Sequence, residues 1–240
     1  MRLRFASLPG RPWALTVLLC VFHGAAIWTA MGGLAGVSSP WPLLMADNGM
    51  HYHHAVLGSR FLGSSGATCG YDPSFMSGYA MSAVSDPSAT PAIVATWAFG
   101  RSYAPVIYKS YALACVALAP VCVALAGLLW RLDSRAVGLS VLLYLAYFWG
   151  DFPLSYAALG MLAYLVAIPL GLVVASTLTG YLERGGAGRW LATAAGMAAV
   201  FLVHPTSGMV LGPAAALAYV VSPGAPSLRR GTLGSGAFPG

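Results

Sequence analysis

The chain has 240 residues, of which 58% are hydrophobic and only 8% are charged. Soluble domains usually carry about 25% charged residues, so this composition excludes an ordinary water-soluble protein. The net charge is +6, but the twelve Lys and Arg residues form short clusters between apolar runs, without interleaved aromatic residues. This distribution is typical of membrane topology and argues against nucleic acid as a partner.

Six apolar runs are candidates for membrane helices. They cover residues 12–34, 104–130, 136–150, 154–180, 190–203 and 207–222. About 20 residues are needed to cross the hydrocarbon core of a bilayer, a length that the first, second and fourth runs provide easily. The sequence therefore predicts an all-α, polytopic bundle of about six membrane-spanning helices that is surrounded by the lipid bilayer.

The arginine residues predict an orientation for these spans. They occur before the first run, between the second and third, between the fourth and fifth, and after the sixth, as Arg2, Arg4, Arg11, Arg131, Arg135, Arg184, Arg189, Arg229 and Arg230. Short cytoplasmic connections are rich in Lys and Arg, so both termini of this multi-pass cell-membrane protein are expected in the cytoplasm. Residues 35–103 then form one long extracytoplasmic loop.

This loop is predicted to be ordered. Residues 48–62 place apolar side chains at helical spacing, which indicates a short helix at the membrane surface. Thr90-Pro91 is typical of a helix start, so a second short helix is expected over residues 91–99. Residues 1–222 are interpreted as one transmembrane module, and residues 223–240, rich in Gly, Pro and Ser, as a disordered tail.

Ionisable side chains gather at the predicted outer surface, where carboxylates are costly unless they are paired or functional. A helix that begins at Asp47 would place Asp47, His51 and His54 on one face, at positions i, i+4 and i+7. Asp47 could cap the helix, act as an acid or base that the imidazoles orient, or join them in binding a divalent metal ion. The spacing alone leaves all three interpretations open.

Further polar residues occur near the outer ends of the predicted spans. His204 precedes Pro205 at the end of the fifth run, where a lone His is usually a satisfied polar group. Lys109, at the outer end of the second run, can extend its ammonium group to the membrane surface or bind a lipid phosphate. Arg101 can do the same, and Asp72 and Asp151 are further outer carboxylates.

The order of these motifs resembles the GT-C superfamily of multi-spanning membrane glycosyltransferases. In chain order they are Asp47 followed by His51 or His53, Tyr71-Asp72-Pro73, Gly78-Tyr79, Tyr108-Lys109, Gly150-Asp151-Phe152 and His204-Pro205. Within this superfamily the chain most resembles bacterial membrane proteins related to 6-pyruvoyl-tetrahydropterin synthase. The resemblance extends over most of residues 10–215.

The resemblance implies transfer of a sugar from a polyprenyl-phosphate-linked donor to an acceptor on the outer face of the membrane. The early loop aspartate of such enzymes acts as the base or helps to hold a metal ion, a role that falls here on Asp47. Cations are needed at the donor phosphate, for which Lys109 and Arg101 are candidates. The other expected substrate contacts are His51, His54, Asp72, Asp151 and His204. Since GT-C enzymes usually have more spans, the chain is also expected to be an N-terminal piece of a longer enzyme.

A non-enzymatic membrane protein, either a transporter subunit or a scaffold, is the alternative. Transporters usually place polar groups and broken helices near the middle of the membrane. Here the middle of the predicted spans holds almost no ionisable residue, and the polar groups gather at the outer surface. This distribution favours chemistry on a lipid-borne substrate over transport, and it leaves a scaffold open.

Overall fold

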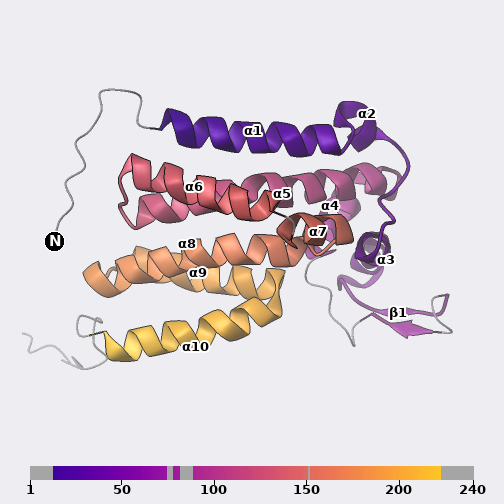
Figure 1. The fold of residues 1–240 in the computed structure, drawn as a ribbon. Helices are drawn as coiled ribbons and strands as arrows, with labels where there is room; N and C mark the ends of the chain where they lie inside the picture. The colour runs from indigo at the N-terminus through magenta and orange to yellow at the C-terminus, as the bar shows by residue number, and fades with distance from the viewer. Residues whose placement is uncertain (1–12, 75–77, 82–88, 151, 223–240) are drawn as a thin grey trace, which may run out of the picture.

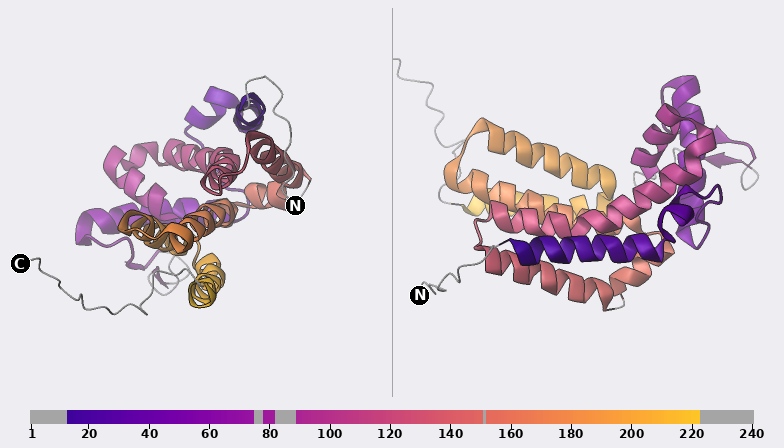
Figure 2. Two further views of the ribbon diagram at one scale, coloured as in Figure 1. Left: turned by 90° about the vertical axis from the view of Figure 1, so that its left-hand side faces the viewer. Right: turned by 90° about the horizontal axis from the view of Figure 1, so that it is seen from above.

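The structure is a computed structural model that describes residues 13–74, 78–81, 89–150 and 152–222. Within these ranges the chain forms α-helices and one small hairpin, so the all-α prediction is confirmed (Figure 1). The predicted tail, residues 223–240, lies outside the described residues. The long helices run side by side, and the shorter elements project beyond one end of them (Figure 2).

The long helices form the body of the molecule. They are α1 (Ala14–Ala30), α5 (Ala104–Leu129), α6 (Ser134–Trp149), α8 (Leu162–Arg184), α9 (Ala187–Val203) and α10 (Pro205–Val221). Gathered at one end are α2 (Gly33–Ser38), α3 (Asp47–Ser65), β1 (Tyr71–Asp72), β2 (Tyr79–Ala80), α4 (Thr90–Phe99), η2 (Arg101–Tyr103) and α7 (Phe152–Leu159). The two helices predicted over residues 48–62 and 91–99 are thus confirmed as α3 and α4. The strands β1 and β2 pair antiparallel.

The prediction of six spans is not supported by helix length. In the described part of the chain, two helices are long and apolar enough to cross a membrane, Arg101–Leu129 and Leu162–Arg184. A third candidate arises if α6 and α7, which are bent by 58° at their junction, count as one broken span. The helices α1, α9 and α10 are apolar but only 17 residues long each, at the lower limit of the usual range.

Two predicted spans are interrupted at glycines. The first run, 12–34, divides into α1 and α2, because Gly32 and Gly33 take φ angles of +81° and +60°. The fourth run, 154–180, divides at Gly160, whose φ is +92°, into α7 and α8. L side chains are strained in this left-handed region and glycine is not. Neither run therefore forms one continuous helix over its full length.

The core lies between the long helices, while their outward faces remain apolar. Ile27, Tyr108, Phe148 and Leu162 are buried in one cluster that joins α1, α5, α6 and α8. The outward side chains of α1 and α10 include large apolar residues that are 65–78% exposed, namely Leu18, Phe22, Val210 and Val220. Since α10 has no buried residue at all, its surface suits contact with lipid better than contact with water.

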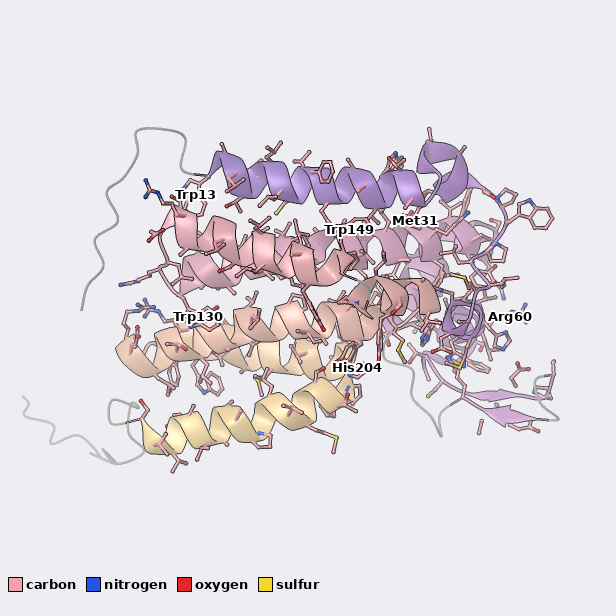
Figure 3. The ribbon with its side chains drawn as sticks, viewed as in Figure 1. Trp13, Met31, Arg60, Trp130, Trp149 and His204 are labelled. Carbon is pink, nitrogen blue, oxygen red and sulfur yellow. The ribbon has the colours of Figure 1, made fainter. Side chains whose placement is uncertain are left out.

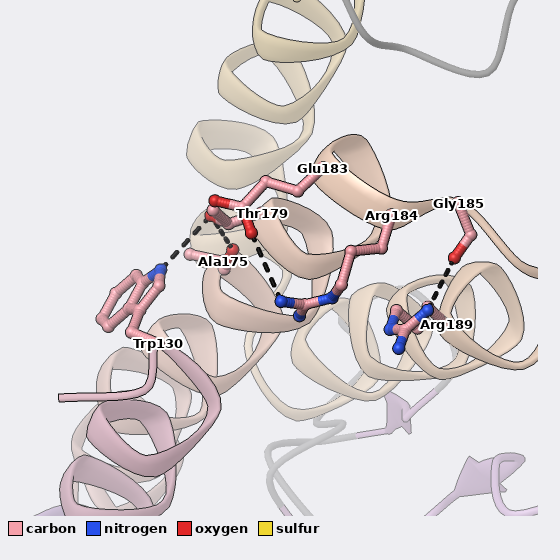
Figure 4. Close-up of polar contacts among 7 residues, drawn as sticks. All are labelled: Trp130, Ala175, Thr179, Glu183, Arg184, Gly185 and Arg189. Carbon is pink, nitrogen blue, oxygen red and sulfur yellow. Dashed lines mark hydrogen bonds and ion pairs between the residues drawn. The ribbon is translucent and has the colours of Figure 1, made fainter.

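The connections that carry arginine lie at the end of the bundle opposite α3. Trp13 and Trp130 mark this end in Figure 3. Arg184 is 3.4 Å from the carboxylate of Glu183, and the Arg189 guanidinium donates to the Gly185 carbonyl at 3.0 Å (Figure 4). Arg131, Arg135, Arg184 and Arg189 thus lie at the opposite end from α3, whereas Arg60 on α3 lies at the other end.

Candidate functional site

The first turn of α3 packs against the break between α7 and α8. The Asn48 amide donates to the Ala158 carbonyl at 3.2 Å and accepts from the Tyr108 hydroxyl at 3.1 Å. Gly160 approaches so closely that a Cβ there would lie 2.5 Å from the Asn48 backbone nitrogen. These contacts fix the start of α3 against α5 and α7, and so they also fix the position of Asp47.

Asp47 begins α3 but does not occupy its cap position. The cap residue is Ala46, at φ +48° and ψ −130°, and it provides no side-chain cap hydrogen bond. A non-glycine residue in such a sparsely populated backbone region carries about 1–3 kcal/mol of strain, a feature often found at functional sites. The interpretation of Asp47 as an N-cap is thus wrong. Its carboxylate lies in the first turn, where the helix dipole favours negative charge.

Asp47 lines a cavity of about 400 Å³, which we call the Asp47 cavity. Its lining residues are Asp47, Met50, His51, Tyr156, Met161, Ala163, Tyr164 and His204. They come from the outer-loop helix, from both sides of the α7–α8 break, and from the connection between α9 and α10. Figure 3 shows His204 toward the α3 end of the long helices. Asp47 and His51, which are neighbours on α3, therefore line the same cavity as His204, which is far from both in the sequence.

Aromatic and hydroxyl groups hold His204 in place. The ring centroid of His204 lies 5.6 Å from that of Tyr164 in an edge-on arrangement. The ring centroids of Tyr164 and Tyr156 are 5.4 Å apart. The Nδ1 of His204 is 2.7 Å from the Thr206 hydroxyl oxygen. Burial lowers the pKa of His204 below its ordinary value, because the charged imidazolium loses hydration. The neutral imidazole, which can accept a proton, is thereby favoured.

The other loop histidines do not join this cavity. His54 is buried on the core side of α3. His53 lies 3.4 Å from the carboxylate of Asp72, and the Ser74 backbone nitrogen donates to the same carboxylate at 2.9 Å. Asp72 therefore ties the β1–β2 hairpin to α3. No group of three or more His, Cys, Asp or Glu residues within the described ranges is placed to hold a metal ion, so the metal set predicted with Asp47 and His51 is not assembled.

The predicted phosphate-binding cations do not line the Asp47 cavity either. Lys109 is only 4% exposed, and its ammonium donates to the carbonyls of Gly36 at 2.8 Å and Ser39 at 2.6 Å. It lines a neighbouring cavity of about 450 Å³, the Lys109 cavity, with residues of α1, α2, α3, α5, α7, α8 and the α2–α3 loop. Arg101 is exposed on η2. Asp151 lies outside the described residues.

Three residues of the site are not apparent from motif reasoning. Asn48 adjoins Asp47, but its role as the bridge to Ala158 depends on packing between distant segments. Tyr156 and Tyr164 belong to one apolar run. The glycine between them, Gly160, is the one local sign that the run breaks and that both rings can face one cavity.

The Asp47 cavity combines groups that can move protons. It contains one carboxylate, two imidazoles and two phenols. A carboxylate with nearby imidazoles can accept a proton from a bound hydroxyl group and pass it on. The aromatic rings provide flat apolar walls, as is common in small-molecule sites. No family model, curated protein or solved structure matches this chain.

Proposed function

We propose that the protein is a membrane glycosyltransferase of the GT-C type. It transfers a sugar from a polyprenyl-phosphate-linked donor to an acceptor at the outer face of the membrane. The observation that carries the proposal is the meeting of Asp47, His51 and His204 in one cavity beside the outer-loop helix. The order of the sequence motifs indicates the reaction class, and the Asp47 cavity contains the acid–base groups that this class requires.

In the proposed reaction, Asp47 accepts the proton of the acceptor hydroxyl while the acceptor oxygen attacks the anomeric carbon of the sugar. The bond between that carbon and the phosphate oxygen breaks, and the lipid phosphate leaves with the electron pair. His204 contributes an imidazole that is biased toward its neutral form and can take up a proton. Tyr156 and Tyr164 provide aromatic faces for the sugar ring.

We also propose that α1, α9 and α10 cross the membrane, which would make six spans with α5, α8 and the bent α6–α7 pair. A helix of 17 residues is about 25 Å long, so it spans a somewhat thinned bilayer. The outward apolar side chains of α1 and α10 support this placement. The arginine-rich end would then face the cytoplasm together with the start of α1 and the end of α10, and residues 35–103 would lie outside.

Replacement of Asp47 by Asn tests the proposal directly. The variant keeps the shape of the side chain and removes the base, so transfer should fall by about 10²–10⁴-fold. Transfer is measured on purified full-length protein in liposomes, with a panel of radiolabelled polyprenyl-phosphate sugars as donors. Glu183→Gln, an exposed carboxylate at the opposite end, is the matched control and should keep full activity.

Two outcomes would contradict the proposal. An Asp47→Asn variant with the wild-type rate would exclude Asp47 as the base. Absence of transfer by the wild-type protein from every donor in the panel would instead favour the scaffold or transporter-subunit alternative. Insertion of each variant into the membrane is checked first, so that a loss of transfer is not a loss of protein.

A further inference from the structure

Lys109 is the single lysine of this chain, because eleven of its twelve basic residues are arginine. It lies on α5 and is 4% exposed, whereas arginines such as Arg60 and Arg101 are exposed on the surface. An ammonium group is a compact point charge with three donors, unlike the planar fork of a guanidinium. The chain thus has a side-chain ammonium group at one position only, and that position is buried.

The contacts of this ammonium group leave its charge uncompensated. Two donors are used by the carbonyls of Gly36 and Ser39, which are neutral acceptors. In the part of the chain that the structure describes, no carboxylate forms an ion pair with Lys109. A buried charge is costly unless it is paired, so the third donor is suited to an anion that the described residues do not supply.

The cavity beside Lys109 is almost entirely apolar. Its volume of about 450 Å³ lies within the range of small-molecule sites, roughly 300–1,000 Å³. Ile27, Met31, Val116, Leu154 and Leu162 form much of its wall. The polar side chains of the lining, besides the ammonium group, are the Asn48 amide, the Ser39 hydroxyl and the Trp41 indole. Such a wall accepts a hydrocarbon chain but offers little to a sugar or a nucleotide.

We infer that the Lys109 cavity binds an anionic amphiphile with a single hydrocarbon chain. The head group lies on the Lys109 ammonium, and the chain lies along the apolar wall between α1, α5 and α7. A fatty-acid carboxylate and a phosphate monoester on one chain share this chemistry. Trp41 lines the cavity and is 78% exposed, so the cavity is open beside it and the hydrocarbon chain can enter there. The inference concerns binding alone and does not rest on the proposed transferase activity, because no lining residue is shared with the Asp47 cavity.

Native mass spectrometry of the full-length protein in detergent tests this inference, with palmitate and hexadecyl phosphate as probes. The wild type should retain one molecule of at least one probe, and hexadecanol, which has the same chain without charge, should bind at least ten-fold more weakly. Lys109→Met should weaken binding of the anion at least ten-fold. Arg60→Met, the loss of an exposed cation on α3, should leave it unchanged.

A second variant keeps the test decisive if Lys109→Met does not fold. Ala112→Phe fills the cavity from α5 while the ammonium group stays, and it should also abolish binding. Ala114→Phe, on an exposed face of the same helix, should bind the anions as tightly as the wild type. Binding of only one probe would support the inference and identify the head group as carboxylate or phosphate.

Three results would overturn the inference. The first is that hexadecanol binds the wild type as tightly as the anions do. The second is that the Lys109→Met and Ala112→Phe variants fold and bind the anions as tightly as the wild type. The third is that the wild type binds neither anion. Asp47→Asn should bind the probes normally. A failure of the proposed transfer reaction is therefore distinguishable from a failure of this site.

Discussion

Replacement of Gly160 by Ala should disrupt both the fold and the candidate site, because this glycine separates α7 from α8. Its φ of +92° is unfavourable for an L residue, which adds roughly 1–2 kcal/mol of strain. The new Cβ would lie 2.5 Å from the Asn48 backbone nitrogen, where an ordinary contact begins at 3.4 Å. Because a backbone atom has no alternative rotamer, the first turn of α3 must retreat by about 1 Å, at a further cost of about 1–3 kcal/mol.

The free energy of unfolding of Gly160→Ala should therefore fall by about 2–5 kcal/mol, measured by denaturant unfolding in detergent micelles. A 1 Å displacement of Asp47 relative to His204 should also reduce transfer by about 100-fold in the molecules that remain folded. Gly212→Ala is the control, because a Cβ there meets nothing within 4 Å and its φ is not left-handed. If Gly160→Ala were as stable and as active as Gly212→Ala, the close approach of α3 to the α7–α8 break would be refuted.

Two further predictions concern His204 and the membrane orientation. The pKa of His204 is lowered in the folded protein, so the unfolded chain binds the proton more readily, and stability should decrease as the pH falls through the ordinary value of 6.5 toward the lowered one. His204→Gln should flatten this part of the stability–pH curve in thermal unfolding, and an unchanged curve would show that His204 is not the group responsible. Cys69 is exposed and lies within residues 35–103, which we propose to be outside, so a membrane-impermeant maleimide should label it in intact cells. Labelling of Cys69 only after the membrane is opened would overturn the proposed orientation.

The sequence predicts the local elements well, because their signals are local. The apolar stripe of residues 48–62 and the proline after Thr90 identify α3 and α4 before any packing is known. The breaks at Gly32 and Gly160 are not predictable in the same way. Membrane helices tolerate glycine, so the residue type alone does not indicate whether its φ becomes positive.

The site is predictable only in part, because its geometry depends on contacts between distant segments. The spacing of Asp47, His51 and His54 suggests one shared face, but only the first two line the cavity, since His54 turns toward the core. The position of His204 beside Asp47 depends on how α8, α9 and α10 pack. Similarly, Lys109 resembles an ordinary lysine at a membrane surface until its two carbonyl partners show that it is buried.

The break between α7 and α8 forms a wall with a ligand-sized cavity on each side. Ala157, Ala158 and Leu162 face the Lys109 cavity, whereas Tyr156 and Tyr164 face the Asp47 cavity. A ligand that moves this short wall from one side therefore changes the shape of the space on the other side. If binding in one cavity displaces this wall, occupancy of the two cavities is coupled, and linkage requires that each ligand alter the affinity for the other by the same factor. A lipid in one cavity would thus set how tightly the other binds its own ligand.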